Sequence, residues 1–422
     1  MREMKDSGIE WIKEIPAEWA VQRGKAILKL QKRSPEGYEE VITCFRDGEV
    51  TLRKNRREEG FTFSDKEIGY QGIQTGDLVI HGMDGFAGAI GISDSDGKGS
   101  PVLVVCTSDQ NQRYLMYYLR MLATQNVFVA LATGIRERSC DLRWNKIAEL
   151  LFPIPPMEVQ DRISAFLDLK CEKVDALISK QQEAIEKLKA YKLSVISEAV
   201  TKGLNPDTPM CDSGIEWLGC IPAHWEFRRT KSMAKIVDCK NRTPENKPDG
   251  EYTVVRTTCI KDGKFSYEGS FQTDEENYII WTERGAPMMG DVFFTREAPM
   301  GEACMVPDAD NLCMGQRVMY FRPFDDVDGR FVLYSIYGPL VREYIESKSK
   351  GSTVGHLKLG QVADLPMLYC PYEEQQQICN YLDRECEKID VLIQRKQVVI
   401  ERLIEYKKAL IYEVVTGKRE VP

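Results

Sequence analysis

Apolar residues recur at heptad spacing between residues 158 and 200, a stretch that contains neither proline nor glycine. Side chains that repeat in this way at the a and d positions form the seam of a coiled coil, so the stretch is predicted to be one long helix. At ~1.5 Å per residue, this helix is a rod on the order of 60 Å long. Its apolar seam residues include Leu167, Val174, Ile178, Ile185 and Leu188.

The same pattern returns 215 positions later, where Leu382 stands in the place of Leu167. Even the polar interruptions of the seam return, because Lys407 matches Lys192. Two equal helices in one chain are predicted to pack on each other, antiparallel, rather than expose their seams. The matching apolar seam residues of the second helix include Leu382, Ile389, Ile393, Ile400 and Leu403.

A third apolar row runs along both helices, one position before each a residue of the heptad, and its largest members are Tyr191 and Tyr406. A rod of two helices needs only the a and d rows, so the extra width predicts that helices of partner proteins dock here. The alternative is that this row packs on the globular parts of the same chain. The full row consists of Leu177, Ala184, Tyr191, Leu392, Val399 and Tyr406.

The repeat is larger than the helix. Residues 6–25 and 212–231 are identical at twelve of twenty positions, whereas the stretches from about 30 to 150 and from about 236 to 365 look unrelated. The chain is therefore predicted to be a variable domain, a helix, a second variable domain and a second helix, with boundaries at 1–156, 157–203, 204–371 and 372–422. Each variable domain reads as short strands joined by hairpin turns, so the fold class is α+β.

Aromatic residues at helical spacing mark residues 111–132 of the first variable domain. Tyr114, Tyr117, Tyr118 and Met121 form one stripe of this predicted helix. We interpret the stripe as part of the core rather than as a platform on which bases stack.

Charge argues against a surface that is basic throughout. The net charge is -8 and the pI about 5.3, so any surface that binds nucleic acid must be local or completed by a partner. Basic residues do follow both copies of the opening motif, at Arg23 and Lys25 and again at Arg228, Arg229 and Lys231. These clusters are either local anion-binding faces or an ordinary solvated surface.

Composition excludes several other classes of protein. The 13 cysteines contain no C-x-x-C and the three histidines are scattered, so no metal site is predicted. The protein is expected to be cytoplasmic, with thiols that are reduced and mostly buried in its interior. No signal peptide is recognised, and no apolar run approaches the ~20 residues of a membrane span.

Catalytic motifs are missing from the sequence. There is no G-x-x-x-x-G-K-[ST] phosphate loop and no G-x-S-x-G nucleophile motif. Asn205-Pro206-Asp207 lies in the stretch between the repeats and does not make a methyltransferase motif. We therefore predict no catalytic residues and no enzymatic activity for this chain alone.

Several stretches together resemble a known family over essentially the whole chain. The long helices open with PIPPMEVQDRISAFLD and CPYEEQQQICNYLD, and EAVTKGLNPDTP lies between the repeats. The variable domains contain GDLVIHGMDGFAGAIGISDSDGKGSPV and GDVFFTREAPMGEA, the latter followed by NLCMGQRVMYFRP. On these motifs the chain resembles the specificity subunit of a type I restriction-modification system.

The resemblance implies a role without chemistry of its own. It implies two target-recognition domains that each read one half of an asymmetric, bipartite site in double-stranded DNA, held at a fixed spacing by the two helices in a pseudo-two-fold arrangement. It also implies that two modification (methyltransferase) subunits dock on the helices and that two restriction (endonuclease and translocase) subunits can join. S-adenosylmethionine, ATP and Mg²⁺ are then expected on those partners, with no cofactor in this chain and no membrane involved.

Basic side chains in the variable domains are the candidates for DNA contacts, because arginine can either read guanine edges or hold phosphates. The candidates for the first half-site are Arg53, Arg56, Arg57, His81, Arg136 and Arg138, and those for the second are Arg256, Arg296, Lys348, Lys350 and His356. Two other functions remain open. One is a self-contained modification or nuclease enzyme, and the other is a coiled-coil scaffold that joins two modules that do not read DNA.

Overall fold

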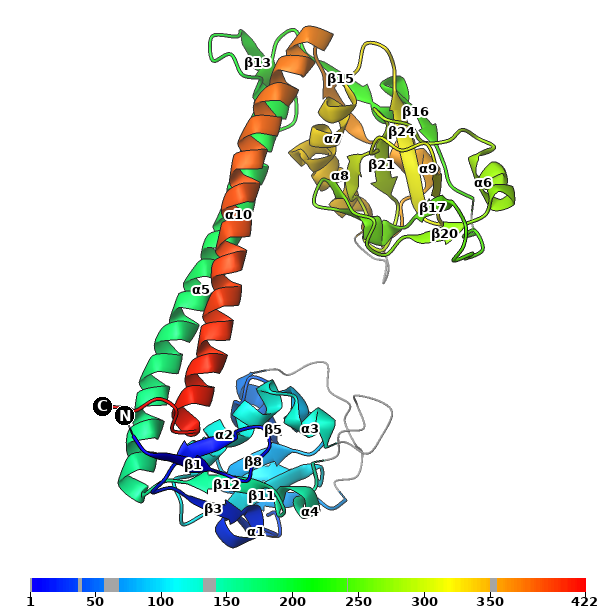
Figure 1. Cartoon of the computed structure of the whole chain (residues 1–422). Helices are drawn as coiled ribbons and strands as arrows, with labels where there is room; N and C mark the ends of the chain where they lie inside the picture. The colour runs from blue at the N-terminus through cyan, green and yellow to red at the C-terminus, as the bar shows by residue number, and fades with distance from the viewer. Residues whose placement is uncertain (1, 37–39, 57–67, 132–141, 241, 350–354) are drawn as a thin grey trace. The chain divides into compact units, whose positions relative to one another are not determined.

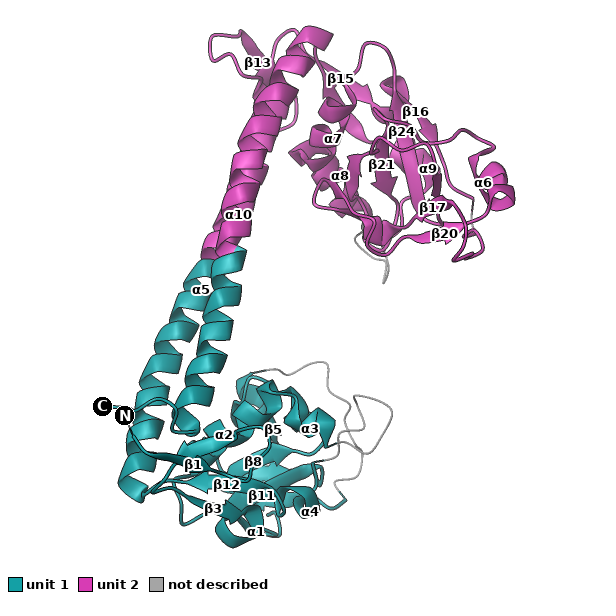
Figure 2. Cartoon of the chain, viewed as in Figure 1, with its two compact units in different colours: residues 1–182, 397–422 teal, residues 183–396 magenta. Residues whose placement is uncertain are grey.

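The computed structural model describes residues 2–36, 40–56, 68–131, 142–240, 242–349 and 355–422. The chain divides into two compact units, residues 1–182 with 397–422 and residues 183–396 (Figure 2). Each unit contains a globular part of mixed helices and strands together with a segment of each of two long helices. The units are described separately below.

The two long helices are α5 (Met157–Lys202) and α10 (Tyr372–Val415), which confirms both helices predicted from the heptad pattern (Figure 1). The predicted a and d seam residues are buried or half-buried along both helices. In the third apolar row, by contrast, Tyr191 is 60% exposed and Tyr406 is 46% exposed. Among the described residues, the large side chains of this row are therefore not buried by the globular parts.

Within each unit the segments of α5 and α10 pair antiparallel, and one ion pair joins them. In the first unit the Lys407 ammonium lies 2.7 Å from the Asp175 carboxylate. In the second unit Lys192 lies 2.8 Å from Asp390. The two lysines are the polar interruptions of the seam, and each of these residues is the repeat equivalent of its counterpart. The same charged pair thus sets the register of the helices in both units.

The globular part of the first unit is built on a four-stranded antiparallel sheet in the order β4-β11-β8-β9. Its strands are β4 (Lys29–Leu30), β8 (Leu78–His81), β9 (Ile90–Ile92) and β11 (Leu103–Thr107). Two-stranded pairs surround it: β1 (Met4–Asp6) with β2 (Glu14–Pro16), β3 (Ala20–Arg23) with β12 (Leu151–Ile154), β5 (Ile42–Cys44) with β6 (Val50–Leu52), and β7 (Gln71–Ile73) with β10 (Gly97–Gly99). Its helices are α1 (Gly24–Ile27), α2 (Gln112–Thr124), α3 (Val127–Ala130) and α4 (Trp144–Ile147).

The second unit has a matching four-stranded antiparallel sheet in the order β16-β24-β21-β22, although the two sequences look unrelated here. Its strands are β16 (Ala234–Val237), β21 (Val292–Thr295), β22 (Ala303–Met305) and β24 (Val318–Pro323). A second sheet contains β17 (Tyr252–Val255), β20 (Phe271–Thr273) and β23 (Leu312–Met314). The remaining pairs are β13 (Met210–Asp212) with β14 (Cys220–Pro222), β15 (Glu226–Arg229) with β25 (Pro366–Tyr369), and β18 (Ile260–Lys261) with β19 (Lys264–Phe265). Its helices are α6 (Glu275–Thr282), α7 (Gly329–Tyr337), α8 (Pro339–Ser349) and α9 (Leu359–Ala363).

Helix α2 places its aromatic stripe in the core, as predicted. Tyr114 and Tyr118 are fully buried, and Tyr117 is only 7% exposed. The buried hydroxyls find backbone acceptors, since Tyr114 donates to the Pro153 carbonyl at 2.7 Å and Tyr118 donates to the Leu151 carbonyl at 2.7 Å. The stripe therefore fixes α2 against β12 and is not available for base stacking.

A buried glutamine near the start of each long helix holds the globular part in place. Gln160 accepts the backbone N–H of Asn111 at 3.0 Å, and Gln375 accepts that of Asp328 at 2.9 Å. Asn111 and Asp328 are the N-cap residues of α2 and α7. Both glutamines are fully buried, so their amides are satisfied by protein atoms alone.

About two helical turns further on, an aspartate of each long helix binds a tyrosine and an arginine of the domain helix. Asp168 accepts the Tyr117 hydroxyl at 2.7 Å and pairs with Arg113. Asp383 accepts the Tyr334 hydroxyl at 2.6 Å and pairs with Arg330 at 2.8 Å. Burial and the adjacent carboxylate raise the pKa of both tyrosines, so both remain hydrogen-bond donors.

Replacement of the buried Gln375 by leucine removes acceptors and donors that three backbone groups use, at Asp328, Cys370 and Asp326. We expect Gln375→Leu to lower the free energy of unfolding by about 2 kcal/mol, because these groups stay buried without a partner. Urea unfolding followed by circular dichroism measures this. Gln394→Leu, at an exposed position of α10, is the control. Equal stability of the two variants would contradict the role of Gln375.

Asp390 gives the helix pairing a pH dependence. Burial opposes ionisation, but hydrogen bonds from Lys192 and Lys264 outweigh it and hold the pKa of Asp390 below its usual value. The stabilisation is therefore present above the ordinary aspartate pKa of about 4 and is lost as the pH falls through the lowered pKa. We expect Asp390→Asn to lower the free energy of unfolding by about 1 kcal/mol at neutral pH and by progressively less below pH ~4. Thermal unfolding at a series of pH values measures this, with Glu387→Gln as the exposed control. A stability difference between Asp390→Asn and the unaltered chain that grows in acid would contradict the prediction.

Candidate nucleic-acid interface

An aspartate directly before the central strand anchors that strand in both units. Asp77 accepts the Gln74 backbone N–H at 2.8 Å and pairs with Arg33, and its side chain is 3% exposed. Asp291 accepts the Met288 N–H at 3.0 Å, and its side chain is 2% exposed. A charge-assisted pair with Arg322, at 2.7 Å, completes this second anchor. The Gly-Asp motif of each domain thus positions β8 and β21 and the residues at their ends.

His81 lies at the end of β8 in the first unit. Its Nδ1 accepts the Asp84 backbone N–H at 3.0 Å, so the ring proton is on Nε2 and can be donated to a ligand. Burial lowers the pKa of His81, with an opposing contribution from Asp84, so the imidazole is neutral at physiological pH. Arg46 pairs with Asp84 at 2.8 Å and adds an exposed positive charge beside the histidine.

The residue after the central strand also binds the segment that closes each domain. The Gly82 carbonyl accepts the Leu142 N–H at 2.8 Å, and the Arg296 carbonyl accepts the Leu357 N–H at 3.1 Å. Leu142 and Leu357 are repeat equivalents, 215 positions apart. The chain on the C-terminal side of residues 132–141 and of residues 350–354 therefore returns to the same edge of the sheet in both units.

In the second unit this edge has different chemistry. Arg296 is only 8% exposed and its guanidinium donates to Asp238 at 3.1 Å. Glu297 lies beside it and pairs with Arg317 at 2.6 Å and with His356 at 3.1 Å. The structure thus brings the predicted residues Arg296 and His356 together. The burial of Arg296 favours a positioning role for this residue, while Arg317 and His356 are the exposed groups.

The other predicted residues are dispersed. Arg56 pairs with Asp47 and Glu49 and stacks on Phe45, with its guanidinium 4.4 Å from the ring centre. Arg53 donates to the Thr43 hydroxyl at 3.4 Å. In the second unit Lys348 is exposed near the Tyr344 ring, and Arg256 is exposed with its guanidinium 3.4 Å from the Gly269 carbonyl. Arg57, Arg136, Arg138 and Lys350 lie outside the described residues.

The basic clusters after the opening motifs are paired within the protein. Arg23 and Lys25 bind Glu149, and their repeat equivalents Arg229 and Lys231 bind Asp364. Hydrogen bonds from the partner lysine and arginine lower the pKa of Glu149 and of Asp364. These contacts favour the solvated-surface interpretation of both clusters over an anion-binding face.

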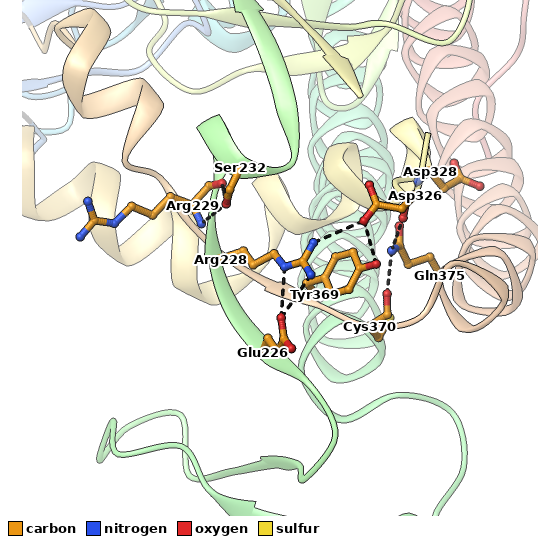
Figure 3. A network of polar contacts seen from close by, with 9 residues as sticks. All are labelled: Glu226, Arg228, Arg229, Ser232, Asp326, Asp328, Tyr369, Cys370 and Gln375. Carbon is orange, nitrogen blue, oxygen red and sulfur yellow. Dashed lines mark hydrogen bonds and ion pairs between the residues drawn. The ribbon is translucent and has the colours of Figure 1, made fainter. Parts of the chain in front are cut away.

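Arg228 belongs to a polar network at the junction of the domain and α10 (Figure 3). Its guanidinium lies 3.2 Å from the centre of the Tyr369 ring and pairs with Glu226 at 3.2 Å and with Asp326 at 3.5 Å. The Tyr369 hydroxyl donates to Asp326 at 2.9 Å, and Gln375 donates to the Asp326 carbonyl at 3.1 Å. Arg228 therefore stabilises the junction, and its positive charge is already balanced by two carboxylates rather than available to a ligand.

Sequence reasoning missed Arg46 and Arg317. Arg46 directly precedes the predicted Asp47-Gly48 turn, and a basic residue at a hairpin tip was the available signal. Arg317 lies in a motif that the resemblance did single out, and its φ of 78° is one that side chains rarely adopt. A strained backbone conformation persists only where surrounding contacts stabilise it, and here the ion pair of Arg317 with Glu297 is one such contact.

Other kinds of site are not formed by the part of the chain that the structure describes. Its His, Cys, Asp and Glu residues make no group of three that could hold a metal ion. Its helices include none that is both long and apolar enough to cross a membrane. Burial raises the pKa of thiols such as Cys44 and Cys106 to about 12, so these cysteines are inert rather than nucleophilic.

Comparison with known proteins gives these features a context. Residues 222–402 match the family model of the type I restriction modification DNA specificity domain. A protein of Methanocaldococcus jannaschii, assigned as the type I restriction enzyme MjaX specificity subunit, is 23% identical over 434 aligned positions, which cover 97% of this chain and 96% of that protein. The chain is thus similar to type I restriction-modification specificity subunits, to their DNA specificity domain over residues 222–402 and to one such subunit over nearly the whole length.

The fold is also found among solved structures of such systems. A chain from a study of complex assembly and conformational transition of the type I R-M system superposes with a TM-score of 0.69. The superposition covers 96% of this chain and 99% of that chain at 16% identity, so it shows a shared fold.

Arg256 and Arg228 make a matched pair for testing this interface. Among the described residues Arg256 has no carboxylate partner, whereas Arg228 is bound to two carboxylates. In the complex with modification subunits, we expect Arg256→Ala to reduce the slope of log affinity against log salt by about one if it contacts phosphate. Arg228→Ala should leave that slope unchanged. Fluorescence anisotropy with labelled target DNA measures both, and identical slopes for the two variants would remove Arg256 from the interface.

Proposed function

We propose that this specificity subunit selects an asymmetric, bipartite target in double-stranded DNA, with one half read by each globular part. The observation that supports the proposal is that both units anchor the central strand of the sheet in the same way, but carry different side chains where that strand ends. Asp77 and Asp291 anchor the central strand in the same way, but His81 follows in one unit and the Arg296–Glu297 pair in the other. Base edges are distinguished by the donors and acceptors offered to them, so the two edges suit different half-sites.

The long helices supply the spacing in this proposal. Their seams repeat with the same length and the same charged pair, so two globular domains attached to them form a pseudo-two-fold reader. Dimeric DNA-binding proteins present two similar elements to a duplex in the same manner. Here one chain provides both elements, and because the elements differ, the target is asymmetric.

The exposed third apolar row is the proposed docking surface for two modification subunits. Tyr191 and Leu177 on α5 and Tyr406 and Leu392 on α10 are all more than 40% exposed, which is unusual for large apolar residues at the regular spacing of a helix face. Two restriction subunits would then join the complex in the cytoplasm. S-adenosylmethionine, ATP and Mg²⁺ would bind those partners, and this subunit would contribute recognition alone, without catalysis.

The scaffold alternative is less well supported, because residues 222–402 match a DNA specificity domain. The alternative of a self-contained enzyme lacks any catalytic motif to support it. An assay of the purified chain with DNA and either S-adenosylmethionine or Mg²⁺ separates that alternative, since labelled or cut DNA without other subunits would favour an enzyme.

The proposal is tested by sequencing methylated adenines in DNA from cells that carry this subunit with its modification subunit. We expect a two-part, asymmetric motif. Exchange of one globular region for that of another specificity subunit should change one half of the motif and leave the other half intact. A complex that assembles but methylates without dependence on this chain would contradict the proposal.

The predicted arginines near the closing segment provide a sharper test of the first half-site. We expect Arg136→Ala combined with Arg138→Ala to weaken binding of the complex to DNA with an intact first half-site by about tenfold or more, since a good arginine–base contact contributes ~1–3 kcal/mol. DNA in which only the second half-site is intact should be bound as before. Equal loss on scrambled DNA would show that these arginines contact phosphates only.

A further inference from the structure

Glu297 holds two exposed basic side chains where the central strand of the second unit ends. One carboxylate oxygen, Oε1, lies 2.6 Å from Nε of Arg317, and the other, Oε2, lies 3.1 Å from Nδ1 of His356. The side chains of Arg317 and His356 are 46% and 41% exposed, whereas that of Glu297 is 18% exposed. The carboxylate is therefore fixed at both oxygens, and the arginine is the group that faces solvent.

The first unit has apolar residues, Met83 and Val102, at the equivalent positions. Backbone hydrogen bonds define the equivalence. The residue after each central strand donates its N–H to the Val102 carbonyl at 2.9 Å in the first unit and to the Arg317 carbonyl at 3.0 Å in the second. Met83 follows this donor in the first unit and Glu297 follows it in the second. Both units therefore form the same frame, and the frame does not require an ion pair at this place.

The backbone at Arg317 is also not one that favours arginine. Its φ of 78° lies in the left-handed region, which glycine adopts freely and other residues adopt with strain. Glycine would suit this position better than arginine on local grounds. The arginine side chain is therefore present at the expense of backbone strain, which points to a use for its guanidinium.

The ion pair leaves a defined part of that guanidinium free. Glu297 contacts Arg317 through Nε, and no other carboxylate among the described residues pairs with this arginine. The two outer nitrogens, Nη1 and Nη2, can therefore donate side by side to a ligand. In the major groove guanine presents two acceptors side by side, O6 and N7, and no other base does so.

The adjacent carboxylate disfavours a phosphate as this ligand. A phosphate attracts arginine through net charge, but here Glu297 offsets the charge of Arg317 and repels an anion. The edge of a base is uncharged, so it accepts the two hydrogen bonds without that repulsion. An arginine that is already held in place also loses less conformational entropy when it binds.

Building on the proposed function, we propose that Arg317, oriented by Glu297, reads a guanine in the half-site that the second unit binds. Glu297 is a positioning residue, because it acts through Arg317. The first unit presents Met83 and Val102 at this place, and neither side chain can donate a hydrogen bond to a base. The guanine contact therefore belongs to one half-site only.

The test selects DNA of random sequence on the complex of this chain with modification subunits and sequences the bound fraction. The unaltered complex should enrich a two-part motif with guanine at one position of one half. We expect Arg317→Gly to reduce the preference for that guanine about tenfold or more and to leave the other half of the motif unchanged. Glycine adopts the φ of 78° without strain, so this variant should stay folded.

Two further variants separate positioning from structure. Arg228→Ala, which removes an arginine bound to two carboxylates at the junction with α10, is the matched control and should retain the guanine. Glu297→Gln keeps the size of the side chain but removes the charge that offsets Arg317. It should weaken the preference for guanine and raise the affinity for scrambled DNA. A merely structural role of Glu297 would not raise that affinity.

Salt dependence separates a base contact from a phosphate contact. Arg317→Gly should leave the slope of log affinity against log salt unchanged. A slope lowered by about one, with the motif unchanged, would assign Arg317 to a phosphate and overturn the proposal. A motif that keeps its guanine in Arg317→Gly, or that loses a different base, would overturn it too, while the two-part motif would still support the proposed function. Absence of a two-part motif from the unaltered complex would overturn both.

Discussion

Each unit depends on the junction between its long helix and its globular part. At this junction a fully buried glutamine holds the N-cap of the domain helix, and an aspartate about two turns further along the same long helix binds a tyrosine and an arginine. The contacts of Gln160 and Asp168 recur at Gln375 and Asp383, although the domains around them look unrelated in sequence. A polar network of this kind has few alternative geometries when it is buried, so it fixes the direction in which each domain projects from its helix.

Because these contacts recur in both units, the residues that differ can be compared at equivalent positions. The same aspartate anchors the central strand of each sheet, and the same backbone hydrogen bond returns the closing segment to the end of that strand. The side chains at that edge are among those that differ. A neutral histidine beside Arg46 can donate one hydrogen bond, whereas Glu297 with Arg317 presents a carboxylate and a guanidinium. Under the proposed function, a frame shared by the two units with different edge residues is a physical basis for reading two different half-sites.

The sequence predicted most of what depends on local periodicity. The two helices, their seam, the exposed Tyr191 and Tyr406, and the buried tyrosine stripe of α2 follow from spacing alone, because one helix face must be apolar to be buried. Pairings between distant residues could not be predicted in this way. Arg228 and Arg296 resemble any other arginine in sequence, and only the fold shows that Asp326 and Asp238 bind them. The closing residues Arg136 and Arg138 lie outside the described residues, so their role stays a prediction.

The central claim is that the helices set the spacing between two DNA half-sites. The most direct test inserts seven residues after Gln182 in α5 and seven after Val399 in α10, which preserves the heptad seam in both units. At ~1.5 Å per residue the helices gain about 10 Å, equivalent to about three base pairs of DNA. Sequencing of methylated DNA should then show the same two half-sites with a spacer about three base pairs longer. An assembled, active complex with an unchanged spacer would contradict the account.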